Sequence, residues 1–528
     1  MSPISHPLAR PLRIAVAALA VALSALVLAA CGEDKKASST SAGPATLVPA
    51  EAIAYGEVLV QPSGEVGEGV EAALRKIVRV DDPGAELRRW LDEETSSGTR
   101  DGYSRWVEPW LGDSVGVFAL AGAGSGSEPP EWAAVFQSTD ADRAKKMFED
   151  DDDTDLEKVG AYEGVDYWRD TEENLIGGVV EGFVVMGSLG GFRAAVQASK
   201  GRSLADDSDF REAAGSVPDD RLAWGWLDGR ALVELIEQSG ATEDPEIASN
   251  LEQLDLDSVG NLVVSLTMRA DQIVLEGSGD GVQEVLGESG EGSLSIEDMP
   301  ADAWLAFAGP LVQSQLREQL GGTGGYARAL DELRSLTGLD LERDLLSWIG
   351  GIGFFARGTS PLDLGAGLVA GSSDEAASKR FVGRLEQLAG ATGLQTASVV
   401  GGDGFQVRLP DFPQPLVVLA RDDRVAIAIG LGTARDAVDP PQAFGEEEPA
   451  KSAIASLGGG YRADFVLTVD PLVALLTNLG ATRDPEVQQV LPYLSAYRSL
   501  AIGTKVDDDR TSFKLVVGLQ DPDEDQGE

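Results

Sequence analysis

The chain of 528 residues contains a single histidine, His6, and a single cysteine, Cys31. Everything after residue 31 therefore lacks both an imidazole and a thiol. Ser-His-Asp triads, Cys-His pairs, HExxH motifs and zinc sites made of histidine and cysteine all need these side chains. The sequence excludes these classes of site from the main body, and a lone cysteine cannot form a disulfide within one chain.

Basic residues are also scarce: 42 Lys and Arg stand against 88 Asp and Glu, for a formal net charge of −46. Nucleic acids bind through basic surfaces, so we expect no nucleic-acid partner. The chain has no SxxK pair and no GxxxxGK[ST] phosphate loop. Catalysis by carboxylates alone stays open, because so many acidic residues offer too many pairs for spacing in the sequence to decide.

The first thirty residues are typical of an export signal. Arg10 and Arg13 precede a largely apolar run that ends in LAAC at Cys31. This tetrad resembles the lipobox of bacterial lipoproteins, which implies a signal peptide over residues 1–30, cleavage between Ala30 and Cys31, and a diacylglycerol on Cys31 with acyl chains such as palmitate. The alternatives are an uncleaved anchor and an incidental cysteine.

A lipidated Cys31 predicts where the protein resides. Two or three acyl chains on one residue hold a protein stably on a bilayer, whereas one chain does not. Residues 31–45 are rich in small and polar residues and are expected to form a flexible tether. We therefore expect a protein anchored to the cell membrane and facing its extracytoplasmic side.

The chain repeats itself. Residues 240–246 read GATEDPE and residues 480–486 read GATRDPE. Other blocks recur in the same order: VPAEAIA (48–54) with MPADAWL (299–305), PWLGDSVGVFALAG (109–122) with SWIGGIGFFARG (347–358), and STDADRAKKMF (138–148) with SSDEAASKRFV (372–382). We expect a tandem duplication of a unit of about 240 residues, with copies at 46–290 and 291–520 and an acidic, disordered tail at 521–528.

The repeated heptad has the signature of a helix–loop–helix connection. In the second copy Gly480 can end one helix, Asp484 can cap the next, and Pro485 suits its first turn. The first copy has the same residue types at 240, 244 and 245. The competing hypothesis is a pair of cation sites, formed by Asp244 with Glu246 and by Asp484 with Glu486.

The rest of each copy indicates an α+β fold. Strands are expected at 52–60, 114–120, 131–137, 163–169, 175–187 and 262–279, helices at 141–150 and 191–199, and a hairpin turn at 421–424. Adjacent strands joined by short turns pair antiparallel. We therefore predict, in each copy, a largely antiparallel sheet with helices packed on one face.

The lipobox, the tether and the motif LVPAEA at Leu47–Ala52 together resemble a family of exported bacterial proteins, the domain of unknown function 3352 family. The resemblance supports the fold and the extracytoplasmic location. It implies no activity and no catalytic residues.

Two groups of residues are candidates for ligand binding. Asp151, Asp153 and Asp155 lie in an acidic run that could bind Ca²⁺, although the EF-hand pattern fails where it needs glycine and glutamate. Trp224 and Trp226 share one face of a predicted strand. They form either part of the core or a platform on which a sugar or a peptide stacks.

These observations favour a non-catalytic protein that binds or scaffolds another extracytoplasmic protein, without a cofactor beyond the lipid. One alternative is a lipoprotein that captures a solute between the two copies. The other is a hydrolase that acts on envelope glycans with carboxylates alone.

Overall fold

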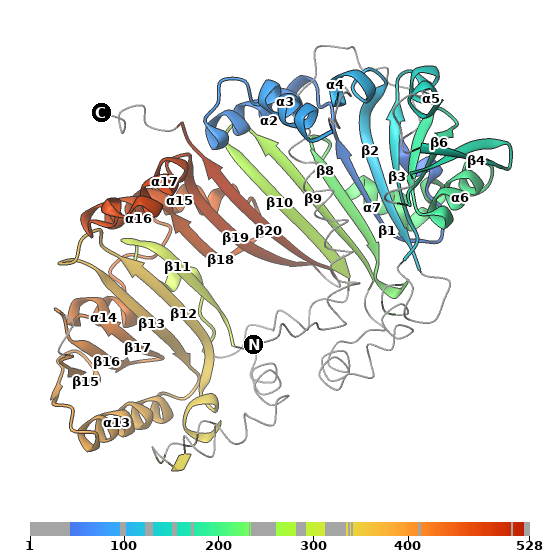
Figure 1. The fold of residues 1–528 in the computed structure, drawn as a ribbon. Helices are drawn as coiled ribbons and strands as arrows, with labels where there is room; N and C mark the ends of the chain where they lie inside the picture. Colours follow the sequence, from blue (N-terminus) through green and yellow to red (C-terminus); the bar gives the residue numbers. More distant parts are fainter. Residues whose placement is uncertain are drawn as a thin grey trace. The chain divides into compact units, whose positions relative to one another are not determined.

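The computed structural model describes residues 43–95, 102–121, 130–149, 156–170, 174–231, 233, 260–280, 292–311, 334–335, 338, 340, 342–409, 413–507 and 510–521. The chain divides into two compact units, residues 1–281 and 282–528. Figure 1 colours the strands of the first unit from blue to yellow-green and those of the second from yellow-green to red. Each unit is described by itself.

The first unit is built on one antiparallel sheet. Its described strands are β1 (Ala52–Leu59), β2 (Leu111–Leu120), β3 (Trp132–Ser138), β4 (Leu156–Tyr162), β5 (Val165–Asp170), β6 (Ile176–Val180), β7 (Phe183–Gly187), β8 (Ala223–Asp228), β9 (Asn261–Arg269) and β10 (Gln272–Asp280). They lie in the order β4-β5-β6-β7-β3-β2-β1-β8-β9-β10. The helical segments are η1 (Pro44–Leu47), α2 (Gly64–Val78), α3 (Pro83–Thr95), α4 (Tyr103–Trp106), α5 (Ala141–Glu149), α6 (Leu189–Ala198), η2 (Leu204–Asp206) and α7 (Ser208–Ser216).

The second unit is also built on an antiparallel sheet. Its described strands are β11 (Ala303–Pro310), β12 (Ile349–Arg357), β13 (Gly365–Ser372), β14 (Thr396–Ser398), β15 (Asp403–Val407), β16 (Leu416–Arg421), β17 (Arg424–Ile429), β18 (Arg462–Thr468), β19 (Tyr497–Asp507) and β20 (Arg510–Leu519). They lie in the order β14-β15-β16-β17-β13-β12-β11-β18-β19-β20. The helical segments are η4 (Ile296–Asp298), η5 (Glu342–Leu346), α13 (Glu375–Ala391), α14 (Leu431–Val438), α15 (Ala450–Ser456), α16 (Val469–Asn478), η6 (Ala481–Arg483) and α17 (Pro485–Leu494).

The two sheets have the same strand order when β1 to β10 are matched in turn with β11 to β20. An isolated bridge outside the strands also recurs, joining Pro49 to Ser203 in the first unit and Pro300 to Ala443 in the second.

A tryptophan before β2 and one before β12 make the same contacts. Trp110 and Trp348 are 2% and 1% exposed. Each indole N–H donates to the backbone carbonyl four residues earlier, at 2.5 Å and 2.7 Å. Each tryptophan carbonyl accepts from a backbone amide 2.8 Å away, that of Thr139 or of Ser373. These bonds tie the start of β2 to the end of β3, and the start of β12 to the end of β13.

Helices pack on both faces of the first sheet around β6 and β7, so the prediction of helices on one face was wrong. In the first unit α5 packs on one face, where Phe148 stacks on Trp168 with ring centroids 5.3 Å apart. Phe192 of α6 and Phe210 of α7 lie in the core on the opposite face. The sequence carried a signal for this: β7 reads FVVMG, without the alternation of a strand that has one solvated face.

The second unit follows the same plan. Val382 of α13 packs with Val418 and Val425 on one face of the sheet. The alternate residues of β17, Ala426 and Ala428, point to the other face and are equally buried. Covering both faces gives each unit two apolar layers.

The second heptad is a helix–loop–helix connection, as its sequence predicts. Gly480 has a left-handed φ of 74° and follows α16 closely. The Asp484 carboxylate accepts a hydrogen bond from the amide of Glu486 at 2.9 Å and caps α17, with Pro485 in its first turn. The first heptad lies outside the described residues, as do the predicted helix and loop around it.

The predicted hairpin turn at 421–424 joins β16 to β17, with Arg421 opposite Arg424 and Asp422 at a φ of 50°. β6 and β7 form a second hairpin, whose turn at Glu181 and Gly182 has φ values of 45° and 86°. Two consecutive positive φ values are typical of the tight turns that join antiparallel strands.

Candidate functional site

The structure places the sequence-predicted site residues in two classes. Ala30, Cys31, Asp151, Asp153 and Asp155 lie outside the described residues, and so does His6. Trp224 and Trp226 are each 6% exposed and belong to the core of the first unit. Side chains this deeply buried present no platform on which a sugar or a peptide could stack.

Trp224 and Trp226 pack in an aromatic cluster. The Trp224 ring lies 5.6 Å from that of Tyr55 and 5.4 Å from that of Phe210, and Phe210 also meets Trp226 edge-on at 5.6 Å. The Glu57 carboxylate accepts hydrogen bonds from the Tyr55 hydroxyl at 2.9 Å and from the Trp224 indole at 3.3 Å. Burial, followed by the nearby Glu57 carboxylate, raises the pKa of Tyr55 well above its usual value. The phenol therefore remains a neutral donor.

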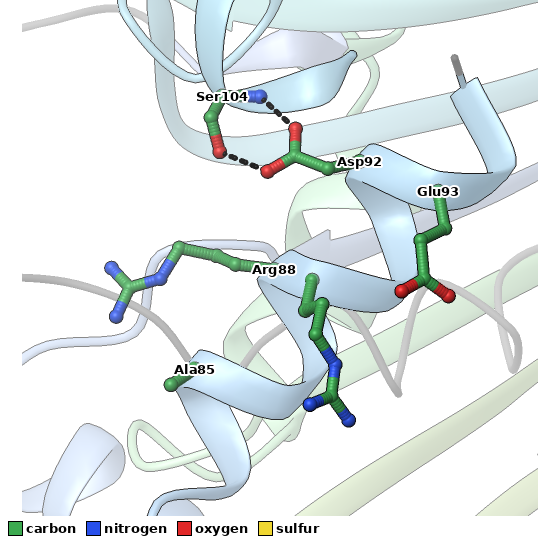
Figure 2. Close-up of a pocket in the computed structure, with 6 residues that line it drawn as sticks. Ala85, Arg88, Asp92, Glu93 and Ser104 are labelled. Atoms are coloured by element: carbon green, nitrogen blue, oxygen red, sulfur yellow. Dashed lines mark hydrogen bonds between the residues drawn. The ribbon is translucent and has the colours of Figure 1, made fainter. Parts of the chain in front are cut away.

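An open pocket of about 640 Å³ lies on the first unit between α3 and α4 (Figure 2). It is lined by Ala85, Arg88, Arg89, Asp92, Glu93 and Ser104. Asp92 accepts hydrogen bonds from the Ser104 amide at 2.8 Å and from its hydroxyl at 2.7 Å. Arg89 pairs with Glu86, and Arg88 lies 3.7 Å from Glu108. The charged groups of this pocket thus pair with their own neighbours rather than converging on a ligand.

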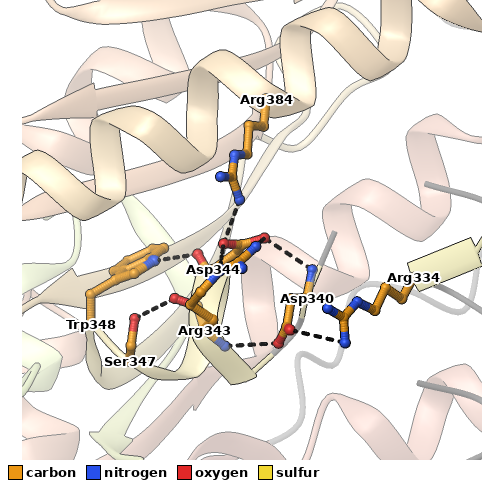
Figure 3. Close-up of polar contacts among 7 residues, drawn as sticks. All are labelled: Arg334, Asp340, Arg343, Asp344, Ser347, Trp348 and Arg384. Atoms are coloured by element: carbon orange, nitrogen blue, oxygen red, sulfur yellow. Dashed lines mark hydrogen bonds and ion pairs between the residues drawn. The ribbon is translucent and has the colours of Figure 1, made fainter. Parts of the chain in front are cut away.

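A buried carboxylate organises a polar cluster in the second unit (Figure 3). The Asp344 side chain is 7% exposed. It accepts hydrogen bonds from Nε and Nη2 of Arg343 at 3.0 Å and 3.3 Å and from the Asp340 amide at 2.9 Å, and it pairs with Arg384 of α13. The hydrogen bonds from Arg343, assisted by Arg384, hold the pKa of Asp344 well below its usual range.

The Asp344 cluster fixes backbone positions. The Asp344 carbonyl accepts the indole N–H of Trp348, and the Arg343 carbonyl accepts the Ser347 hydroxyl at 2.7 Å. The cluster therefore joins α13 to the η5 turn that leads into β12. The contacts of the Asp344 cluster stabilise the fold, and they do not form a reactive site.

The most distinctive surface was not predicted from the sequence. One face of the second sheet carries a row of cross-strand neighbours that we call the aromatic row: Leu515, Ile502, Phe465, Phe307, Phe354 and Leu368, from β20 to β13. Phe307, Phe354 and Leu368 are 37%, 38% and 48% exposed. The other three are partly buried.

The aromatic row has no charged neighbours along its central strands. Leu305 and Gly309 flank Phe307, and Ile352 and Ala356 flank Phe354 on the same face. A chain of net charge −46 thus places no charge beside the row on β11 and β12, and the Arg462–Asp464 ion pair on this face lies at the end of β18, beside Thr504. The sequence signal for the row is the spacing of Leu305 and Phe307, which places two large apolar side chains on one face of β11.

Among the described residues, no group of three or more His, Cys, Asp or Glu is placed to hold a metal ion. In the same part of the chain, no helix is both long enough and apolar enough to cross a membrane.

A family model described as "Protein of unknown function (DUF3352)" matches residues 12–519, nearly the whole chain. The chain belongs to the DUF3352 family. No curated protein matches it.

Among solved structures, this DUF3352 chain is similar to crystal forms I and III of TP0453, each at 13% sequence identity. Form I covers 46% of this chain and 79% of its own length, with a TM-score of 0.25. Form III covers 46% and 80%, with a TM-score of 0.24.

The candidate site of this DUF3352 chain is therefore a surface rather than a cleft. Exposed Phe and Leu side chains without charge can bury apolar area against a partner, at about 25 cal/mol per Å² removed from water. The described part of the aromatic row holds no acid, base or nucleophile. The aromatic row can therefore bind a partner through its apolar side chains.

Proposed function

We propose that the protein is a lipid-anchored, extracytoplasmic envelope protein with a non-catalytic role in binding or scaffolding. The observation that carries the proposal is the aromatic row. Contiguous exposed apolar patches on soluble domains are typical of sites of interaction. Its position on strands of a rigid sheet provides a preorganised docking face.

The anchor is the second part of the proposal. The basic start, the apolar run and the LAAC tetrad support cleavage before Cys31 and its acylation. Dual or triple acylation would hold the body on the extracytoplasmic side of the cell membrane. A partner there would meet the aromatic row within the reach of the tether from the bilayer.

We also propose that the two units arose by tandem duplication. The recurring sequence blocks, the equal strand order, the paired isolated bridges and the matching contacts of Trp110 and Trp348 support it. The aromatic row belongs to the second unit alone, so on this proposal the second unit acquired the binding face after duplication.

The test is a crosslinked pull-down from native membranes of three chains: the wild type, Cys31→Ala, and Phe307→Ser with Phe354→Ser. We expect an associated protein with the wild type, loss of membrane-anchored complex for Cys31→Ala, and loss of the associated protein for the double variant. Leu362→Ser is the matched control, because Leu362 is apolar and 88% exposed but lies in the loop between β12 and β13.

Two results would refute the proposal separately. Full release of the wild type from membranes by salt alone would refute the lipid anchor. Equal recovery of the associated protein with the double variant and the wild type would refute the aromatic row as the contact surface.

A further inference from the structure

The first unit has a row at the same register as the aromatic row. Direct cross-strand pairing places six residues side by side from β10 to β3, and we call them the small-residue row: Gly277, Val264, Gly225, Gly56, Val117 and Ala134. Matched strand by strand, Gly56 corresponds to Phe307 and Gly225 to Phe465. Val117 and Ala134 correspond to Phe354 and Leu368. At these matched positions, the second unit therefore carries large side chains and the first unit carries small ones.

The glycines of this row are not needed by the fold. A Cβ added at Gly56 would lie 3.8 Å from the Trp224 carbonyl oxygen, and one at Gly225 would lie 3.5 Å from the Tyr55 carbonyl oxygen. Both distances are ordinary van der Waals contacts, and neither glycine has a left-handed φ. Glycine inside a strand costs about 0.5–1 kcal/mol relative to alanine. Retaining two adjacent glycines in central strands thus leaves β1 and β8 without side chains at these positions of the face, at the expense of stability.

The side-chain sizes of the two rows, and the lack of charge in both, favour contact between the two rows. Two sheets that pack face to face lie about 10 Å apart, and they interdigitate best where large residues face small ones. The small-residue row, like the aromatic row, contains no charged residue. Two copies of a chain with net charge −46 repel one another over most of their surface, so uncharged faces are where they can approach.

We propose that the aromatic row of one copy packs against the small-residue row of a second copy of this chain. Such a contact joins two copies of the chain, and dimers are the commonest assembly of soluble proteins. The inference rests on the proposed function in one respect, since both take the aromatic row as a contact surface. It adds the identity of the partner.

The first test is the oligomeric state of the full chain, by sedimentation equilibrium in detergent. We expect a dimer for the wild type and for the control Leu362→Ser. Phe307→Ser with Phe354→Ser removes the large side chains, and Gly225→Leu adds a large side chain to the small-residue row. Each should raise the dissociation constant at least about tenfold, which is about 1.4 kcal/mol. Thermal melting identifies any variant that fails to fold. The double phenylalanine variant and Gly225→Leu change different surfaces, so each tests the contact independently of the other.

The second test is a cysteine crosslink between differently tagged copies, one carrying Phe307→Cys and the other Gly225→Cys, with each single variant alone as control. A disulfide between the two tagged chains supports the inference. Equal disulfide formation in the mixed sample and in each single variant alone, or a wild type that stays monomeric at all concentrations, overturns it.

The outcomes separate this inference from the proposed function. Suppose that the wild type is monomeric and that the double variant loses an associated protein other than a second copy of the chain. The inferred self-association is then wrong, and the proposed binding function stands. If the double variant loses neither self-association nor any associated protein, both fail.

Discussion

Replacing Asp344 by asparagine tests the role of the buried carboxylate in the second unit. The substitution keeps the shape of the side chain and one carbonyl oxygen, and removes the charge that Arg343 and Arg384 contact. We expect Asp344→Asn to lower the free energy of unfolding near neutral pH, because charge-assisted hydrogen bonds contribute about 1.5–3 kcal/mol each.

The magnitude follows from the exposure of the partners. The side chains of Arg343 and Arg384 are 61% and 45% exposed, so water can solvate both guanidinium groups once the carboxylate is gone. The asparagine oxygen can still accept from the Asp340 amide. The loss should thus equal about one charge-assisted bond rather than three, about 2–3 kcal/mol.

The sign of the pH dependence is fixed by the lowered pKa of Asp344. A carboxylate with a folded-state pKa below its unfolded value of about 3.9 stabilises the fold fully above that value. This stabilisation is lost as the pH falls through about 3.9 toward the folded pKa. The difference between wild type and Asp344→Asn should therefore be largest near neutral pH and shrink in acid.

The assay is urea unfolding of both chains across the acid range, followed by tryptophan fluorescence. Trp348, one of nine tryptophans, lies against this cluster and donates to the Asp344 carbonyl, so part of the fluorescence change reports the unfolding of the second unit. Asp422→Asn is the control, since the Asp422 side chain is 81% exposed and such surface pairs contribute at most about 1 kcal/mol. A difference of the same size in acid and at neutral pH would refute the electrostatic argument.

Three further predictions concern packing and caps. Trp224→Ala should lower the free energy of unfolding by about 3–5 kcal/mol in urea titrations, because it leaves a cavity among buried aromatic rings; an unchanged stability would show that the ring is not in the core. Asp484→Ala should cost about 0.5–2 kcal/mol, and Asp484→Ser should retain most of the cap; equal losses for both would contradict capping. Gly191→Ala should destabilise by about 1–3 kcal/mol, since the new Cβ would lie 2.1 Å from the Trp132 carbonyl oxygen and α6 would have to move away from β3; hydrogen exchange of α6 that matches the wild type would contradict this.

Local features of the fold could be predicted from the sequence because their signals are local. The hairpin at 421–424 and the cap at Asp484 follow from turn and capping chemistry confined to a few residues. The family could also be identified with the help of the short motif at Leu47–Ala52.

The second helical layer and the exposure of the aromatic row depend on distant parts of the chain. The sequence of β7 is apolar on both faces, yet only the packing of α5 and α6 shows which helix covers which side. Phe307 looks like an ordinary core residue of an alternating strand. Its exposure depends on which elements leave that face of the sheet open, and spacing within β11 carries no information about that.

The strand order also constrains how the chain acquires its fold. β1 lies in the middle of its sheet, between β2 and β8, and Glu57 pairs across from Trp224 although 167 residues separate them. β11 has the same place between β12 and β18. Contacts of such high sequence separation form slowly. If the chain crosses a membrane N-terminus first, the central strand of each unit emerges early and keeps one bare edge until most of that unit has followed. The edge is a template for aggregation during this interval, so biogenesis of this protein should depend on a holding chaperone on the far side of the membrane.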